Sequence, residues 1–442
     1  MVNPGAPPFA RLSAWHAGAL VVGSMIGTGV FTTSGLLMAQ VGSRGAVLLI
    51  WAAGGLLALM GAAVYAELGA MLPKVGGEYV YLSHAFSPLV GFVSGWLALL
   101  AGFAAPIAAG AAAFGRYAEA AVPGLSGRAA GLALIAIVTA LHARDVVWAA
   151  RVQLGITGIN VSAMVAVVLL GGWSLLTRGA PPPTDAVAAA PTLGATPSLA
   201  GIAVGLVLVS YSYFGWNAAA YVAAEVRAPQ RSVPRALCIG CALVTALYVA
   251  TNAVFVYALP PAALAGQIEI AHLTARALFG PGAARALSAL VALIMAASVS
   301  ALAMTGPRVY LAMAEDGRFF RVFAARNRHG APSAGVLLQG GLALVLFLSA
   351  AFDALLVYVG FTLSLSAAAT VAAAMWLRRK EPDRPRPYRT PGWPLTPLGF
   401  CAASLWMTGY SIIERPRETL AGAATIAVGV VLYRFRSRGP LN

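Results

Sequence analysis

The chain has 442 residues, of which 60% are hydrophobic and only 10% are charged, whereas soluble domains carry about 45–50% apolar and about 25% charged residues. So few charges could not cover a water-soluble protein of this length, and the composition also excludes disordered, collagen-like and disulfide-stapled classes. The formal net charge of +15 would suggest a nucleic acid partner for a soluble chain, but in a membrane protein cytoplasmic loops enriched in Lys and Arg account for it.

Apolar runs recur along the chain, and most are long enough to cross the roughly 30 Å hydrocarbon core of a bilayer. Charged residues and Pro/Gly-rich breaks separate twelve such runs, which predicts an all-α polytopic membrane protein. In chain order the predicted spans are Ala14–Leu37, Ala46–Leu68, Leu89–Tyr117, Ala130–Leu141, Leu154–Leu176, Leu199–Ala224, Ala236–Leu259, Leu287–Leu311, Ala334–Ala351, Leu355–Leu377, Leu395–Ile413 and Leu420–Tyr433. The first run is longer than a signal peptide, so we expect it to remain as a span.

Basic residues gather in alternate loops, those that follow the even-numbered spans. Examples are Arg227–Arg235 after the sixth span and Arg378–Arg389 after the tenth. By the positive-inside rule this pattern predicts that both the N-terminus and the C-terminus are cytoplasmic. We therefore expect a multi-pass protein of the cytoplasmic (inner) membrane. The proline-rich loop Thr177–Ser198 is predicted to be an irregular extracellular connection between two halves.

Two spans contain sequence that a continuous helix in lipid would disfavour. The segment Gly23–Gly29 in span 1 includes glycines at 23, 27 and 29, and Tyr211–Asn217 in span 6 places polar and aromatic groups around Gly215. Unpaired backbone groups in the bilayer cost several kcal/mol each unless protein, water or a ligand satisfies them. Both segments are therefore predicted to be unwound beside a cavity. For span 1 alone, glycine-mediated helix packing is an equally good interpretation.

Such breaks expose the ends of half-helices to a ligand. A half-helix that begins near Thr28 and Gly29 presents free N–H groups and the positive end of its dipole, which suits a carboxylate. A half-helix that ends near Tyr211–Tyr213 presents carbonyls, which suit an ammonium group. Together the two ends predict a receptor for a zwitterion such as an amino acid, and paired breaks in two halves are typical of transporters built from repeats.

Five segments carry short motifs that occur in a fixed order. They are Gly27–Phe31, Ala66–Leu82, Gly215–Asn217 followed by Glu225, Pro229 and Pro234-Arg235, Arg308–Gly317, and Leu377–Gly392. In this order they resemble the amino acid–polyamine–organocation (APC) superfamily of transporters, and within it the L-type amino acid transporter branch. The resemblance covers nearly the whole chain.

The resemblance implies the leucine-transporter fold, with twelve transmembrane helices. Residues 14–176 (helices 1–5) and 199–377 (helices 6–10) would form inverted repeats, and 394–436 (helices 11–12) would be peripheral. It also implies that Gly27, Thr28 and Gly29 hold the substrate carboxylate, that nearby carbonyls take its amino group, that Tyr211 is an aromatic gate, and that Asn217 contacts substrate. The implied substrate-binding residues are Met25, Ile26, Gly27, Thr28, Gly29, Tyr211, Ser212, Phe214, Gly215 and Asn217.

One position departs from many relatives of this family. They carry a lysine in helix 5 where sodium binds in sodium-coupled members, but alignment places Asn160 there. Three consequences stay open: a cation near Asn160, Ser298 and Ser300, exchange without an ion, or coupling to protons elsewhere. Asn160 could also simply form a hydrogen bond between helices.

The substrate is predicted to be neutral, because a cationic substrate wants a buried carboxylate and the middle of every span lacks Asp or Glu. We expect a secondary active transporter, a permease or antiporter, for neutral L-amino acids that works by alternating access. A proton- or sodium-coupled symporter and a non-transporting amino acid sensor are the alternatives. An enzyme is not expected, since the spans hold no catalytic constellation.

No cofactor and no metal site are expected. Two thiols do not make a zinc site, so Cys238 and Cys241 on span 7 are interpreted as packing residues. The expected partners are an amino acid substrate and the lipid bilayer, without nucleic acid. A disulfide-linked accessory subunit is not expected, because no cysteine lies between Tyr117 and Arg128.

Overall fold

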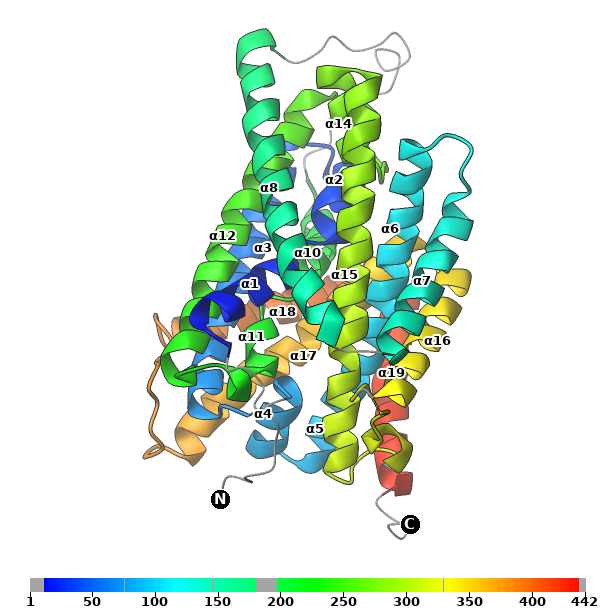
Figure 1. Cartoon of the computed structure of the whole chain (residues 1–442). Coiled ribbons are helices and arrows are strands. Elements are labelled where there is room, and N and C mark those ends of the chain that lie inside the picture. The colour runs from blue at the N-terminus through cyan, green and yellow to red at the C-terminus, as the bar shows by residue number, and fades with distance from the viewer. Residues whose placement is uncertain (1–11, 75, 145–146, 180–196, 329, 437–442) are drawn as a thin grey trace.

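The computed structural model describes residues 12–74, 76–144, 147–179, 197–328 and 330–436 (Figure 1). Within this part of the chain all the regular elements are helices, apart from one isolated β-bridge between Leu12 and Val226. Most of the predicted loop Thr177–Ser198 lies outside the described residues.

The long helices form one bundle. In chain order they and their short companions are α1 (Ala14–Met25), α2 (Thr28–Val41), α3 (Arg44–Met71), α5 (Pro88–Leu97), the π-helix η1 (Ala98–Ala104), α6 (Ala105–Ala121), α7 (Gly127–Arg144), α8 (Val147–Arg178), α10 (Leu199–Tyr213), α11 (Ala218–Tyr221), α12 (Pro229–Ala258), α15 (Pro281–Glu315), α16 (Ser333–Ser349), α17 (Phe352–Lys380), α18 (Leu395–Glu414) and α19 (Pro416–Arg436). The connections hold α4 (Glu78–Ala85), η2 (Ala223–Glu225), α13 (Pro261–Leu264), α14 (Ile270–Phe279) and η3 (Arg321–Ala324).

Among the described residues, nine helical stretches are long and apolar enough to cross a membrane, and α10 and α16 are shorter apolar helices. This confirms a multi-pass helical membrane protein. Each predicted span coincides with a helix or a broken set of helices, but the total of twelve stays a prediction. Most helices extend past the predicted limits, as Gly127–Arg144 does around Ala130–Leu141, because backbone hydrogen bonding continues beyond the apolar part of the sequence.

The third bundle segment changes register in its middle. At η1 the N–H of Ala105 bonds to the carbonyl of Leu100, five residues back. The next residue, Pro106, has no N–H to give to residue 102, so it interrupts the α-helical ladder. A π-helical turn next to a proline accommodates the missing backbone hydrogen bond.

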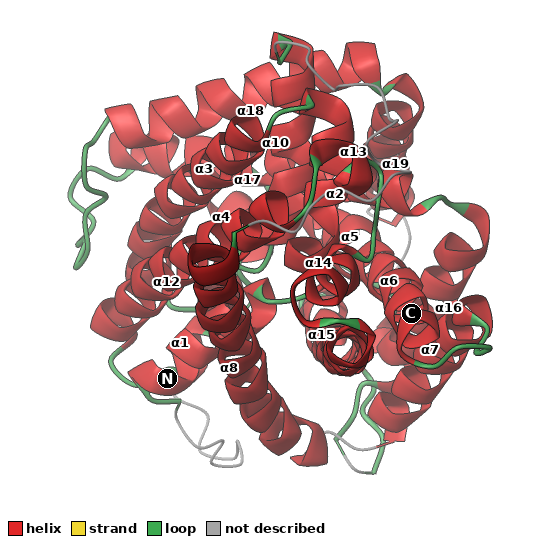
Figure 2. Ribbon diagram, turned by 90° about the horizontal axis from the view of Figure 1, so that it is seen from above, coloured by secondary structure: helices red, strands yellow, loops and turns green. Residues whose placement is uncertain are grey.

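The two ends of the bundle carry different short helices. We call them the α4 end, where α4 and α11 lie, and the α14 end, opposite (Figure 1). Between them α12 packs along α3, and α15 packs along α6 (Figure 2). The largest hydrophobic cluster includes Trp51, Tyr213 and Tyr248 from α3, α10 and α12. Helices far apart in sequence thus enclose the middle of the bundle.

A buried ion-pair cluster ties the loop before α18 to the bundle at the α4 end. Glu67 on α3 is 2% exposed, and its two carboxylate oxygens accept from Arg378 Nε at 2.8 Å and Nη2 at 2.6 Å. Thr390 donates its backbone N–H and its hydroxyl to Glu67 Oε2 at 2.8 and 2.7 Å. Arg386 Nε lies 3.5 Å from Glu67 Oε1, and Arg378 stacks on Trp393 at 3.6 Å from the ring centroid. Residues of the motif Leu377–Gly392 therefore have a structural role, because they hold the loop before α18 against Glu67.

Candidate functional site

The first predicted interruption is present between α1 and α2. Helix α1 ends at Met25, Ile26 has an extended conformation, and α2 begins at Thr28. The last carbonyls of α1 and the first N–H groups of α2 therefore lie opposite one another across two residues. This is the arrangement that the glycines of this segment predicted.

The second interruption separates α10 from α11. Helix α10 ends at Tyr213, and Gly215 has a φ of +102°, a region that L side chains rarely adopt. A Cβ atom on Gly215 would lie 2.5 Å from the carbonyl oxygen of Ser24 on α1. The turn of the second break therefore touches the first break, and only glycine fits between them.

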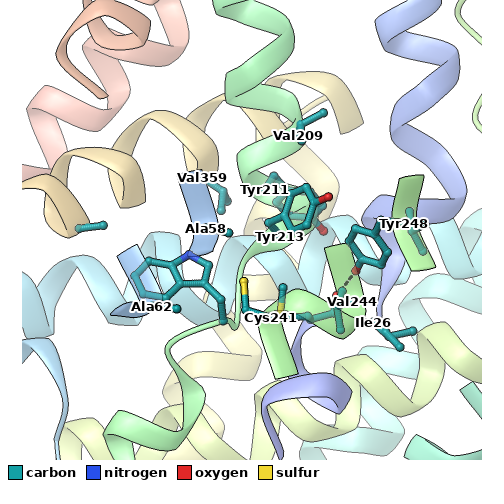
Figure 3. Close-up of a cluster of buried hydrophobic side chains, with 14 of the residues drawn as sticks. Ile26, Ala58, Ala62, Val209, Tyr211, Tyr213, Cys241, Val244, Tyr248 and Val359 are labelled. Atoms are coloured by element: carbon teal, nitrogen blue, oxygen red, sulfur yellow. Dashed lines mark hydrogen bonds between the residues drawn. The ribbon is translucent and has the colours of Figure 1, made fainter. Parts of the chain in front are cut away.

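Tyr248 of α12 joins the two breaks. Its hydroxyl donates to the carbonyl of Met25 at 2.5 Å and lies 3.1 Å from the carbonyl of Ser212. Figure 3 shows Tyr248 close to Ile26 and facing the tyrosines of α10, with the ring of Tyr213 5.0 Å away between centroids. One hydroxyl thus serves carbonyls from the ends of both half-helices. This role of Tyr248 was not predicted from the sequence. The feature that could have indicated it is a hydroxyl group in the middle of a predicted span.

We expect Tyr248→Phe to lower the free energy of unfolding by about 1–3 kcal/mol, because two buried carbonyls lose a donor. Thermal melting of the purified protein in detergent measures this. Tyr358→Phe is the matched control, since it removes a single contact to the Thr425 hydroxyl. Equal melting temperatures for the two variants would contradict the bridging role of Tyr248.

A cavity of about 600 Å³ extends from the breaks toward the α4 end. That volume is in the usual range for small-molecule sites. It lies between α1, the second break, α15 and single residues of the third and fifth segments. The lining residues are Leu12, His16, Ala19, Leu20, Gly23, Ser24, Phe103, Thr157, Phe214, Gly215, Asn217, Ala218, Tyr221, Val222, Ser298, Ala301, Leu302, Met304, Thr305 and Arg308.

The cavity takes in part of the predicted substrate site. Phe214, Gly215 and Asn217 line it. The other seven predicted residues do not line it and are buried behind it: Met25, Ile26, Gly27, Thr28, Gly29, Tyr211 and Ser212. These residues are covered because the start of α2 packs closely against the end of α10. A Cβ on Gly29 would lie 2.4 Å from the Cα of Ser212.

At the α14 end, connections pack over α2. The N–H of Gly266 donates to the carbonyl of Gly35 at 2.8 Å. The hydroxyl of Tyr117 donates to the carbonyl of Phe31 at 2.6 Å and accepts from the N–H of Ala271 at 3.2 Å. These contacts close the bundle on the side away from the cavity.

The three residues of the predicted ion site have different surroundings. Asn160 is 1% exposed, and its Oδ1 has no hydrogen-bond partner among the described residues. The Ser298 hydroxyl lies against Gly27 and lines the cavity. Ser300 points elsewhere, since its hydroxyl contacts His142 Nε2 on α7 at 2.8 Å. Ser300 therefore faces α7, whereas Ser298 faces the first break.

A carboxylate does lie next to the cavity, but it comes from a connection rather than from a span. Glu78, the first residue of α4, is 7% exposed. It accepts from Tyr65 at 2.7 Å, from the amide of Asn217 at 3.1 Å and from Ser366 at 2.6 Å. Burial raises the pKa of Glu78 above its ordinary value. Glu78 lies outside the predicted spans, in the motif Ala66–Leu82, so the lack of Asp and Glu in the middle of the spans did not exclude it.

Two interrupted helices that meet beside a cavity inside a helical membrane protein are typical of secondary transporters. A family model described as "Amino acid permease" matches residues 12–431. Because the match covers nearly the whole chain, the protein belongs to the amino acid permease family. This confirms the resemblance seen in the sequence.

Individual relatives are amino acid transporters. The chain is 28% identical to the cystine/glutamate transporter of Homo sapiens over 421 residues, which cover 94% of this chain and 82% of that protein. It is 27% identical to the Asc-type amino acid transporter 1 of Mus musculus over 423 residues, with coverage of 94% and 78%. It is 29% identical to the large neutral amino acids transporter small subunit 2 of Homo sapiens over 421 residues, again covering 94% and 78%.

Proposed function

We propose that this protein is a secondary active transporter of neutral L-amino acids that carries them across the cytoplasmic membrane by alternating access. The observation that carries the proposal is the cavity of about 600 Å³ beside two touching helix breaks. Free N–H and carbonyl groups at such breaks suit the two charges of an amino acid. The name of one relative, the large neutral amino acids transporter small subunit 2, supports it.

The proposal includes the leucine-transporter fold. Residues 14–176 and 199–377 would be inverted repeats, with 394–436 peripheral. Both stretches begin with a broken helix, which supports this division. Both termini would be cytoplasmic, which places the α4 end inside. The basic loops 227–235 and 378–389 support that orientation.

We assign substrate contact to the ten predicted residues in two groups. Phe214, Gly215 and Asn217 would contact an amino acid in the conformation described here, because they line the cavity. The group Met25–Gly29, with Tyr211 and Ser212, would become accessible when the half-helices move apart. The carbonyls of Met25 and Ser212 already accept from Tyr248, so an ammonium group would share or displace that hydroxyl.

Neutral substrates suit the lining of the cavity. Its described residues include no Asp or Glu, whereas His16 and Arg308 contribute basic groups. A cationic side chain would therefore lack a partner. A second candidate is an anionic amino acid, favoured by Arg308 and by the likeness to a cystine/glutamate transporter.

Uptake of radiolabelled amino acids into proteoliposomes tests the function. Neutral, anionic and cationic substrates are compared while internal amino acid, sodium and pH are varied in turn. Uptake that needs internal amino acid indicates exchange, and dependence on sodium or on a proton gradient indicates a symporter. Binding of a neutral amino acid without flux indicates a sensor. Absence of both binding and uptake for every amino acid would overturn the proposal.

We expect Asn217→Ala to weaken substrate binding by about tenfold to a hundredfold, because the cavity loses its hydrogen-bonding amide. Thr28→Val is expected to weaken binding as well. Ser210→Ala is the matched control, since its hydroxyl bonds within α10 to Leu206 at 2.7 Å. Equilibrium binding of the transported amino acid measures all three. Unchanged affinity for Asn217→Ala would contradict the assigned site.

A further inference from the structure

Among the described residues, the buried carboxylate Glu78 has no cationic partner. Its contacts are three hydrogen-bond donors, Tyr65 on α3, Asn217 beside α11 and Ser366 on α17. The titratable groups that face it from the described elements around it are the tyrosines Tyr65, Tyr81 and Tyr221, and none of them supplies a positive charge. Burial opposes its ionisation, while the three donors favour it. The charge of Glu78 therefore depends on the balance between burial and these three donors.

Asn217 stands between this carboxylate and the substrate cavity. It lines the large cavity, and with Glu78 it also lines a smaller void of about 50 Å³ on the other side of the second break. That void is large enough for more than one water molecule. Serines at positions 210, 364 and 404 line it too, so water there has polar partners. The void therefore gives Glu78 a space for water that is separate from the substrate cavity.

The connection that carries Glu78 is also fastened to α11. The N–H of Gly76 donates to the carbonyl of Tyr221 at 3.2 Å. Gly77 has a φ of +52°, and a Cβ there would lie 2.7 Å from the ring of Tyr221. Glu78 is thus linked, through Gly76 and Gly77, to the half-helix that begins after Asn217.

We propose that Glu78 is a proton-binding residue that positions Asn217, so that proton uptake and substrate binding oppose each other. An ionised carboxylate can only accept hydrogen bonds, so it holds the Asn217 Nδ2 group toward itself. The amide oxygen of Asn217 is then left to accept from the ammonium group of an amino acid. This inference rests on the proposed function.

Protonation weakens that arrangement. Glu78 takes one proton from water and becomes neutral. No other covalent bond of the protein forms or breaks. The hydrogen bond from Asn217 loses its charge assistance, which accounts for roughly half of its strength. Asn217 is then held less firmly, and substrate affinity falls. By linkage, substrate binding must in turn lower the affinity of Glu78 for a proton.

The test is the apparent KM for uptake of a neutral amino acid, measured from about pH 5 to about pH 8, a range above the ordinary pKa of a glutamate, about 4.3. For the wild type we expect KM to rise by about fivefold to tenfold as the pH falls through this range. Glu78→Gln should give a flat profile at the high KM of the acidic wild type, because its side chain is always neutral. A wild-type slope in Glu78→Gln would overturn the inference.

Ser366→Ala is the matched variant at the same carboxylate. It removes a donor that favours the ionised form and leaves Asn217 untouched. The midpoint of the KM profile should therefore move to higher pH, with normal KM at the alkaline end. A merely structural role for Glu78 would raise KM at every pH in Ser366→Ala, and this result would also overturn the inference. If Glu78→Gln does not fold, the pH profile of KM for Ser366→Ala still tests the inference.

A double variant tests whether Glu78 acts through Asn217. In an Asn217→Ala background, Glu78→Gln should change neither KM nor its pH dependence further. Full additivity would refute the positioning role. If the wild type transports neutral amino acids with a KM independent of pH, the inference fails while the proposed function stands. If the wild type neither transports nor binds any amino acid, the proposed function itself fails.

Discussion

Glu67→Ala is expected to destabilise the protein by about 3–5 kcal/mol, because it leaves cations in a buried cluster without their counterion. Arg386 is 8% exposed and Arg378 is 21% exposed, so water can replace little of the lost carboxylate. Thr390 would lose the acceptor for both its N–H and its hydroxyl. Thermal melting in detergent and the yield of monodisperse protein measure the loss.

The control for Glu67→Ala is an exposed ion pair at the same end of the bundle. Glu315 pairs with Arg326 at 3.1 Å, and both side chains are about half exposed. Glu315→Ala should cost at most about 1 kcal/mol, as surface pairs do. Glu67→Gln keeps the hydrogen-bonding shape without the charge and should fall between the two. If Glu67→Ala melts at the wild-type temperature, the cluster does not anchor the loop before α18.

Gly215→Ala is expected to cost about 2–5 kcal/mol and to abolish uptake. Two penalties combine: a φ of +102° strains an L residue, and the new Cβ would collide with the backbone of Ser24. The collision partner is main chain, which cannot rotate away. Relief requires the two helix breaks to separate, and this would distort the cavity beside them.

Gly18→Ala provides the comparison on α1. Nothing lies within 4 Å of a Cβ built on Gly18, and the residue is inside a regular helix. Alanine there should be neutral or stabilise the helix by up to about 1 kcal/mol. Uptake and melting temperature are measured for both variants. Normal uptake by Gly215→Ala would show that the close contact between the breaks is dispensable.

The breaks could be predicted from sequence because their cause is local. Glycines 23, 27 and 29, and the polar run around Gly215, are unfavourable in lipid wherever the rest of the chain lies. The structure interrupts both helices within those segments. The helical spans were predictable for the same reason, since apolar length is a property of each segment alone.

The surroundings of the breaks could not be predicted, because they depend on tertiary contacts. Tyr248 lies 36 residues from Ser212 in the chain, and Glu78 lies 139 residues from Asn217. No periodic pattern connects such pairs. The sequence also could not show that Thr28 and Tyr211 are covered while Phe214 and Asn217 face the cavity, since that depends on which way the half-helices lean.

The contacts that cover α2 at the α14 end can be compared in energy with the binding of a substrate. The contacts of Gly266 and Tyr117 are a handful of hydrogen bonds, mostly to main chain, and each is worth about 0.5–1.5 kcal/mol net. A ligand held with micromolar to millimolar affinity supplies about 4–8 kcal/mol. If the proposed transport cycle opens this side of the bundle, the hydrogen bonds that must break cost together no more than the binding of one small solute supplies.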